Sequence, residues 1–252
     1  MRNKFFYKIT ILFILIFHFV SVSGQEKEEK ENLIKMDVGV DFLSRYVWRG
    51  QNTGGPAPSI QPSITFSIGN FSINACGSNS VGSNQMIQEA DLTLSYFTKY
   101  FSVSFVDYFL PNDTVFNNKY FEFDKDATTH VFETQIKITP FEKIPAYLSF
   151  SMNIFGADMK NKDGDIVYSK YLELGYSKDC GKFAFDVFAG AALDEPNEGK
   201  GYYANEKIGI INLGITATKN VEITEKFSLP IKTSVVVNPE SENIYVFLGI
   251  SF

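Results

Sequence analysis

Apolar and polar side chains alternate along most of this chain, in segments of about ten residues that begin at Met36. Successive side chains of a β-strand point to opposite faces, so this alternation predicts strands with one apolar and one polar face. Each segment is close to the roughly 9–11 residues that a tilted membrane-spanning strand requires. About twelve such segments follow one another up to Phe252. The sequence therefore predicts an all-β fold.

The connections between these segments also alternate in length and polarity. Those after the first, third, fifth, seventh and ninth segments are long and polar, whereas most of the others are short. Long outer loops, short inner turns and an even strand number are typical of bacterial outer-membrane barrels. We therefore expect residues 36–252 to form one transmembrane, antiparallel up-and-down β-barrel of about 12 strands, with N- and C-termini periplasmic. A secreted β-sandwich that binds a ligand would give similar alternation and remains an alternative.

The last segment, Asn243 to Phe252, carries no charge and ends on an aromatic residue. It resembles the terminal strand of bacterial outer-membrane barrels. The resemblance implies that the barrel-insertion machinery reads this strand and that it pairs with the first strand. Outer-membrane lipid and this machinery are thus the expected partners.

The N-terminus has the pattern of a secretory signal peptide. Three basic residues precede an apolar core at residues 9–20, and Gly24 provides a small residue for cleavage. The core of about 12 residues is shorter than the roughly 20 that a spanning helix needs. We expect residues 1–24 to be removed, residues 25–35 to form a charged periplasmic linker, and the protein to reside in the outer membrane of a Gram-negative cell envelope.

Composition excludes several functional classes. The net charge of −6 argues against a nucleic-acid partner. The cysteines, Cys76 and Cys180, are too few for a disulfide framework and have no metal-ligand spacing, so we expect them to stay unpaired. A hydrolase needs a nucleophile or an activated water held by histidine and a carboxylate. Beyond the leader only His130 is available, so we expect no enzymatic activity.

Two acidic clusters in connecting segments could suggest chemistry. We interpret His130, near Asp124 and Asp126, as a solvated loop residue. Three further aspartates depart from the EF-hand spacing, and we interpret them as a turn: Asp158, Asp163 and Asp165. The sequence therefore predicts no metal and no cofactor.

Aromatic residues fall near the ends of the expected strands, as two girdles at the membrane surfaces would require. The outer girdle would contain Tyr46, Trp48, Tyr108, Phe109 and Phe155. The inner girdle would contain Phe71, Tyr96, Tyr176, Phe183, Phe227 and Phe252. Pro62 and Pro230 lie inside strands, where each removes a hydrogen-bond donor, and we expect local bulges there.

Charged residues on the polar faces are candidates for lining a pore. Eleven positions share this parity: Asp37, Asp41, Arg45, Arg49, Glu89, Asp91, Glu133, Lys137, Glu173, Asp186 and Lys232. Seven acidic against four basic side chains predict a modestly acidic lumen, and lumen side chains tune selectivity in barrels. Alternatively, Arg45 and Arg49 pair with Asp37, Asp41, Glu89 or Asp91 and plug the interior.

The segment from Phe42 to Gln51 resembles the opening of the TorF family of bacterial outer-membrane porins, in its aromatic residues and its Arg49-Gly50 step. Residues 58–61 and 77–79 also resemble that family, so the likeness covers about Val38 to Ser80. It implies an outer-membrane barrel with a transport function and brings no catalytic residues.

Together these features predict a porin-like channel for passive diffusion of small polar solutes, with a weak cation preference. A structural or ligand-binding barrel with a plugged lumen is the other membrane hypothesis.

Overall fold

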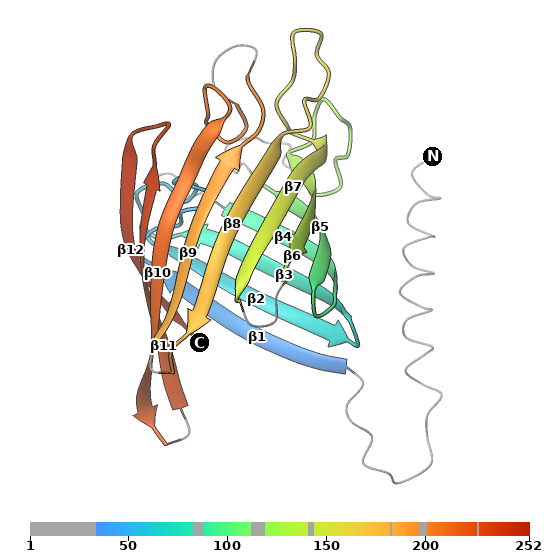
Figure 1. Ribbon diagram of the computed structural model, residues 1–252. Coiled ribbons are helices and arrows are strands. Elements are labelled where there is room, and N and C mark those ends of the chain that lie inside the picture. The colour runs from blue at the N-terminus through green and yellow to red at the C-terminus, as the bar shows by residue number, and fades with distance from the viewer. Residues whose placement is uncertain are drawn as a thin grey trace, which may run out of the picture. The chain divides into compact units, whose positions relative to one another are not determined.

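The computed structural model describes residues 34–82, 88–111, 119–140, 144–181, 183–196, 201–225 and 227–252. Twelve antiparallel strands form a closed barrel in which each strand pairs with its neighbours in sequence and β12 pairs with β1 (Figure 1). The all-β, up-and-down barrel is therefore confirmed. The β-sandwich alternative is wrong, because the sheet closes on itself and does not pack against a second sheet.

The strands have nearly equal lengths, apart from a long β10. Their bounds are β1 Ile34–Leu43, β2 Ser59–Ile68, β3 Phe71–Ser80, β4 Gln88–Phe97, β5 Phe101–Phe109, β6 His130–Ile138, β7 Ala146–Gly156, β8 Lys170–Asp179, β9 Phe183–Ala192, β10 Gly209–Thr224, β11 Phe227–Asn238 and β12 Asn243–Ser251. β1 begins two residues before the expected start of the barrel. The leader, and residues 25–33 of the expected linker, lie outside the described residues.

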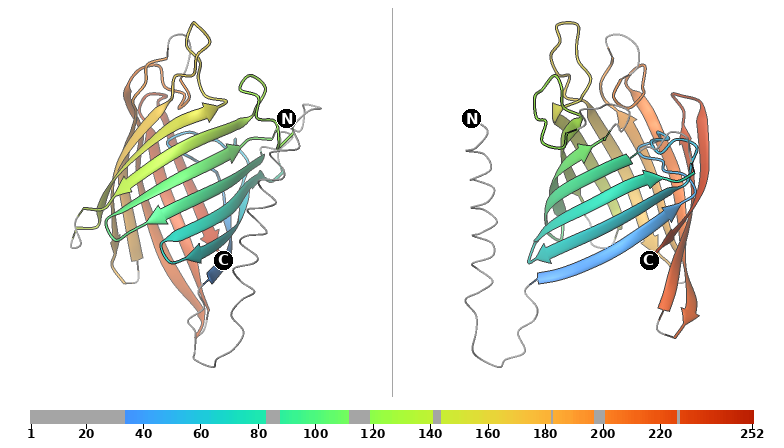
Figure 2. Two further views of the ribbon diagram at one scale, coloured as in Figure 1. Left: turned by 90° about the vertical axis from the view of Figure 1, so that its right-hand side faces the viewer. Right: turned by 180° about the vertical axis from the view of Figure 1, so that it is seen from behind.

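The long and short connections gather at opposite ends of the barrel (Figure 2). β1 begins and β12 ends at the end with the short turns. Two residues separate β10 from β11, because β10 continues to Thr224 and β11 begins at Phe227. Beyond Lys219, β10 pairs with β11 alone, and this hairpin extends past the other strands in Figure 1. In the described part of the chain, no helix has the length and apolarity needed to cross a membrane.

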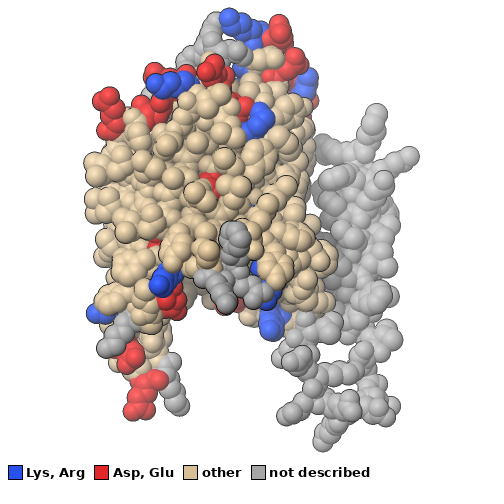
Figure 3. Space-filling model, in the orientation of Figure 1, with Lys and Arg blue, Asp and Glu red and all other residues tan. Residues whose placement is uncertain are grey.

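The outer face of the barrel is apolar between two charged ends. Side chains on the predicted apolar rows are exposed there, including Val38, Leu94, Ile215 and Val246. In the view of Figure 3, most charged side chains lie near the two ends, and uncharged residues cover most of the surface between them. All six aromatics assigned to the inner girdle are exposed: Phe71, Tyr96, Tyr176, Phe183, Phe227 and Phe252. Exposed apolar surface of this extent is what a barrel in lipid requires.

The prolines do not form the predicted bulges. Pro62 keeps its register with Val40 of β1, while the pairing of β2 with β3 omits Gln61 and Pro62 without a shift. Pro230 pairs with Asn220 in register. Because a proline lacks only its own N–H donor, the ladder is interrupted locally and no extra residue is needed.

Candidate functional site in the lumen

The connection between β1 and β2 turns inward at its tip. The N–H of Trp48 donates to the carbonyl of Gln51 (2.8 Å), and the N–H of Gln51 donates back to Trp48 (2.9 Å). The two residues between them, Arg49 and Gly50, have φ angles of 47° and 75°. Reciprocal bonds around two residues with positive φ form a tight hairpin turn of the type I′ kind. We call residues 44–58 the inner loop, and Arg49-Gly50 its tip.

The tip is also fixed against β10 and β11. The side-chain amide of Asn238 in β11 donates to the carbonyl of Gly50 (3.1 Å). A Cβ atom added to Gly50 would lie 1.9 Å from the carbonyl oxygen of Ile211 in β10. Only glycine allows this approach, so the sequence of the tip determines where the inner loop can dock.

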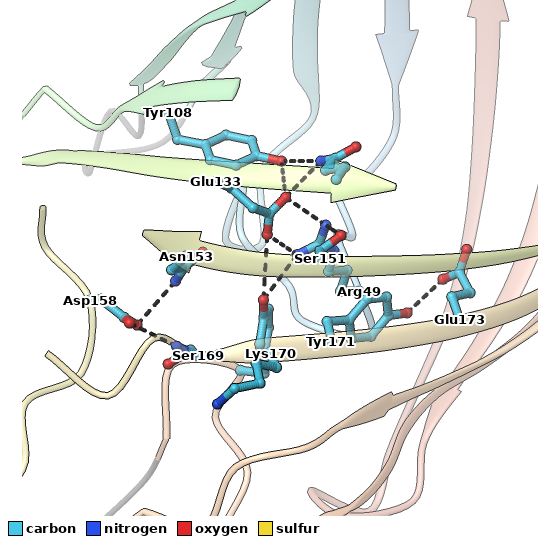
Figure 4. A network of polar contacts seen from close by, with 12 residues as sticks. Arg49, Tyr108, Glu133, Ser151, Asn153, Asp158, Ser169, Lys170, Tyr171 and Glu173 are labelled. Atoms are coloured by element: carbon cyan, nitrogen blue, oxygen red, sulfur yellow. Dashed lines mark hydrogen bonds and ion pairs between the residues drawn. The ribbon is translucent and has the colours of Figure 1, made fainter. Parts of the chain in front are cut away.

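Arg49 reaches from the tip to the wall formed by β6 and β7 (Figure 4). Its guanidinium donates to both carboxylate oxygens of Glu133, at 2.5 and 2.9 Å, and to the hydroxyls of Ser151 (2.9 Å) and Tyr203 (3.1 Å). Burial by itself lowers the pKa of Arg49, but the Glu133 carboxylate raises it more, so the pKa lies above its ordinary value. The bidentate pair thus keeps a full positive charge inside the barrel.

Glu133 is the centre of this network. Its side chain is fully buried, and it also accepts hydrogen bonds from the Tyr108 hydroxyl (3.2 Å) and the Gln135 amide (2.6 Å). A buried carboxylate is costly unless it is paired and hydrogen-bonded. Because the partners of Glu133 include Arg49 from the inner loop, the network fixes that loop across the lumen.

Aromatic rings pack around the tip and make an apolar core inside the barrel. Trp48 contacts Tyr108, Tyr202 and Tyr203, with ring centroids 5.7, 6.4 and 6.0 Å away. The Arg49 guanidinium lies over the rings of Trp48 (4.4 Å) and Tyr171 (4.6 Å). Burial raises the pKa of the Tyr203 hydroxyl, although nearby Arg49 lowers it. The inner loop therefore narrows the lumen with a packed, rigid constriction.

A polar cavity of about 380 Å³ adjoins this constriction. Its lining includes Trp48, Arg49, Lys137, Tyr147, Ser149 and Glu173. The Lys137 ammonium lies 3.8 Å from the centroid of the Tyr147 ring. Glu173 accepts hydrogen bonds from the hydroxyls of Tyr147 (2.8 Å) and Tyr171 (2.6 Å), and from the amide of Asn212 (3.2 Å).

The remaining predicted lumen charges lie away from the tip. Asp41 pairs with Lys232 across the β1–β12–β11 seam (2.7 Å), and Arg45 lies over the ring of Tyr245 (5.9 Å). Four carboxylates occupy other parts of the barrel wall: Asp37 in β1, Glu89 and Asp91 in β4, and Asp186 in β9.

Near β4 the Tyr46 hydroxyl is hydrogen-bonded to Glu89. Burial raises the pKa of Tyr46, and the Glu89 and Asp91 carboxylates raise it further. The predicted pairing of Arg49 with Asp37, Asp41, Glu89 or Asp91 is wrong. Its partner is Glu133, which the inward course of the loop brings within reach.

The outer aromatic girdle was predicted incorrectly at Trp48, Tyr108 and Phe109. β1 ends at Leu43, and the chain then enters the lumen, so Trp48 packs in the interior core. Tyr108 points inward to Glu133, and Phe109 is buried with its ring 5.1 Å from that of Tyr120. Apolar and polar residues keep alternating after Leu43, so the sequence pattern gave no sign that β1 ends there.

Sequence reasoning also missed the tyrosines that build the constriction. Tyr171 shares the parity of Glu173 and so could have been placed in the lumen. Tyr202 and Tyr203 lie in the long polar connection between β9 and β10. Tyr203 is fully buried there, against the tip of the inner loop. Two adjacent tyrosines in an otherwise polar loop are the available signal for an inward contact.

His130 is not the predicted solvated loop residue. Its ring is fully buried, and Nδ1 lies 2.6 Å from Asp107 while Nε2 lies 2.6 Å from the carbonyl of Tyr120. The rings of Phe109 and Phe132 pack on it. This cluster is on the outward parity of β5 and β6, where Asp107 breaks an otherwise apolar row.

The part of the chain that the structure describes contains no group of three or more candidate metal ligands. The backbone N–H groups of Asp163 and Asp165 donate hydrogen bonds to Oδ1 of Asn161, as the predicted turn requires. Asp158, in contrast, is buried and accepts from Asn153 and Ser169. Cys76 and Cys180 are both free, as predicted.

Comparison of the chain with models of known families finds no match, and comparison with curated proteins finds none either. The likeness of Phe42–Gln51 to TorF porins therefore stays a prediction.

Proposed function

We propose that this chain is an outer-membrane channel for passive diffusion of small polar solutes, with a weak preference for cations. The observation that supports this function is a closed barrel with an apolar outer face, whose lumen is narrowed by the inner loop and the tyrosines packed on it. Closure pairs the backbone between strands, which is what spanning lipid demands.

The constriction accounts for the size of the solute. The inner loop crosses from β1 to the β6–β7 wall and leaves a polar cavity beside its tip. Solutes must pass Arg49, Trp48 and the surrounding tyrosines, so a large or apolar molecule is excluded. The TorF-like segment contains this tip, which supports a shared role in transport.

The cellular setting belongs to the same proposal. The outer membrane is the location, with a signal peptide cleaved near Gly24 and N- and C-termini periplasmic. Phe252 is exposed on the outer face beside the short-turn end, which supports recognition of β12 by the barrel-insertion machinery. The proposal assigns the chain no reaction and no nucleic-acid partner.

Conductance tests this function. Protein extracted from the outer-membrane fraction and placed in a planar bilayer should give discrete conductance steps. In Glu133→Gln, Arg49 loses its buried counter-charge, which costs about 3–5 kcal/mol. The tip should loosen, so that single-channel conductance rises above that of the native protein. Unfolding in urea should show the corresponding loss of stability.

The matched control is Asp41→Asn, which removes a lumen carboxylate from a partly exposed pair far from the tip. Its conductance should stay close to that of the native protein. The folded state of each protein is checked by the heat-dependent gel shift of a closed barrel. If neither the folded native protein nor folded Glu133→Gln conducts ions, the barrel is plugged.

A further inference from the structure

The cavity beside the tip contains two opposite charges that do not pair with each other. Among the described residues, neither Lys137 nor Glu173 takes part in an ion pair. Arg49 also lines the cavity, but its charge is neutralised by bidentate contact with Glu133. The cavity therefore presents one free cation and one free carboxylate to its contents.

Register places these two charges in one row across three strands. Lys137 of β6 pairs with Ser149 of β7, which pairs with Glu173 of β8. Neighbouring strands are separated by about 4.8 Å, so the two backbones are about 10 Å apart with only a small serine between them. Tyr147 bridges the row, because its ring lies beneath Lys137 and its hydroxyl donates to Glu173.

Both groups retain hydrogen-bonding capacity. The Glu173 carboxylate has about four acceptor positions, and three protein donors use it. The Lys137 ammonium has three donors and lies against a ring face, which leaves donors directed to the cavity. A solute that offers one anion and one cation would satisfy both groups together.

We propose that this cavity binds a small zwitterionic solute of the amino-acid class, with its carboxylate on Lys137 and its ammonium on Glu173. The inference rests on the proposed channel function and names the solute class for that lumen. Each contact would be a charge-assisted hydrogen bond of about 2.8 Å, and an α-amino acid carries the two charges that both contacts need on one short backbone. A volume of about 380 Å³ is within the range of small-ligand sites.

Trp48 provides the readout, because it is the one tryptophan of the chain and lines the cavity. The folded full-length protein in detergent is titrated with glycine, β-alanine and glycylglycine while tryptophan emission is recorded. Acetate, methylamine and erythritol serve as probes with one charge or none. The zwitterions should give saturable changes at lower concentrations than the single-charge probes, and erythritol should give none.

Charge-removing variants test the two contacts. Lys137→Gln should weaken glycine binding about tenfold or more, because a charge-assisted hydrogen bond is lost. Glu173→Gln should weaken binding by a similar factor. Because this substitution also alters the acceptor of two tyrosine hydroxyls, Lys137→Gln is the variant that tests the site without disturbing them. Arg45→Gln and Asp37→Asn change the same kinds of charge outside the cavity and should bind glycine like the native protein.

The result that overturns the inference is an equal response to glycine and erythritol, or glycine binding that Lys137→Gln leaves unchanged. Binding in detergent and conductance in a bilayer are independent measurements. If the protein conducts ions but its tryptophan emission does not distinguish zwitterions, the proposed solute class is wrong and the channel function stands. If it binds zwitterions but does not conduct, the channel function is wrong and the binding site stands.

Discussion

At the residue scale, the Arg49-Gly50 step determines the form of the lumen. Arg49 adopts a positive φ, which costs a non-glycine residue about 1–2 kcal/mol. The bidentate contact with Glu133 and the hydrogen bond from Asn238 to Gly50 offset that cost. The tip is thus held by contacts with β6 and β11, two strands on different parts of the wall.

Gly50→Ala should displace the tip. The new methyl group would meet the carbonyl oxygen of Ile211 at 1.9 Å, so the tip must withdraw from β10 in addition to accepting a strained φ. We expect a loss of unfolding free energy well above 1 kcal/mol in urea titrations, together with a red shift of Trp48 emission as water reaches the ring.

Gly82→Ala is the matched control. Gly82 also has a positive φ, of 76°, but no atom lies within 4 Å of its added Cβ. Its unfolding free energy should fall by only about 1 kcal/mol, the cost of a positive φ for a residue other than glycine. Its Trp48 emission should match that of the native protein. If the two variants behaved alike, the docking of Gly50 on β10 would contribute nothing.

At the element scale, the strands could be predicted from the sequence and the inward course of the inner loop could not. Alternation specifies which residues share a face, and the structure brings Glu133, Lys137 and Glu173 to the wall around the inner loop. Alternation contains no information on the distance between β1 and β6. The ion-pair partner of Arg49 is set by the tight turn at Arg49-Gly50. The positive φ angles of that turn could not be predicted from the alternation of apolar and polar residues.

The connection between β5 and β6 is a second place where alternation failed. Asp107 and His130 occupy outward positions, where an uncovered carboxylate in apolar surroundings would be costly. Residues Tyr120 and Phe123 of this connection pack on the His130 ring and cover the pair. Both nitrogens of His130 face oxygen acceptors, so the imidazole holds Asp107 and the backbone of Tyr120 together.

Asp107→Asn should release this connection from the barrel wall. The loss of a charge-assisted hydrogen bond to a buried ring costs about 1.5–3 kcal/mol. Lys125 is exposed in the covering segment, so trypsin should cut there about tenfold faster or more, as the opened population grows. Gel electrophoresis of timed digests measures the rate.

Asp126→Asn provides the comparison for the proteolysis. Asp126 is exposed, and Lys160 beside it lowers its pKa through an ion pair at the surface. An exposed pair contributes little to stability, so the cleavage rate should stay near the native rate. Equal acceleration in both variants would mean that the buried pair does not anchor the segment.

At the scale of the whole molecule, ion pairs decide which lumen charges would act on an ion in the proposed channel. Asp41–Lys232 and Arg49–Glu133 are neutral as pairs. Of the eleven predicted lumen positions, five carboxylates and two cations then remain. In the proposed channel, carboxylates in excess would attract cations, because a cleft lined mainly by one sign of charge focuses the electric field. Acidic groups thus still outnumber basic ones among these positions, although two carboxylates and two cations are cancelled by pairing.

The reversal potential across asymmetric potassium chloride should therefore have the sign of a weakly cation-selective channel. Asp37→Asn combined with Asp186→Asn removes two of the remaining carboxylates, one from β1 and one from β9, and should move the reversal potential toward zero. Asp41→Asn combined with Lys232→Gln also changes two lumen residues but removes equal and opposite charges, so its reversal potential should match the native value. Because free charges and not paired ones set the preference, a zero or anion-selective native potential would contradict this assignment of the lumen charges.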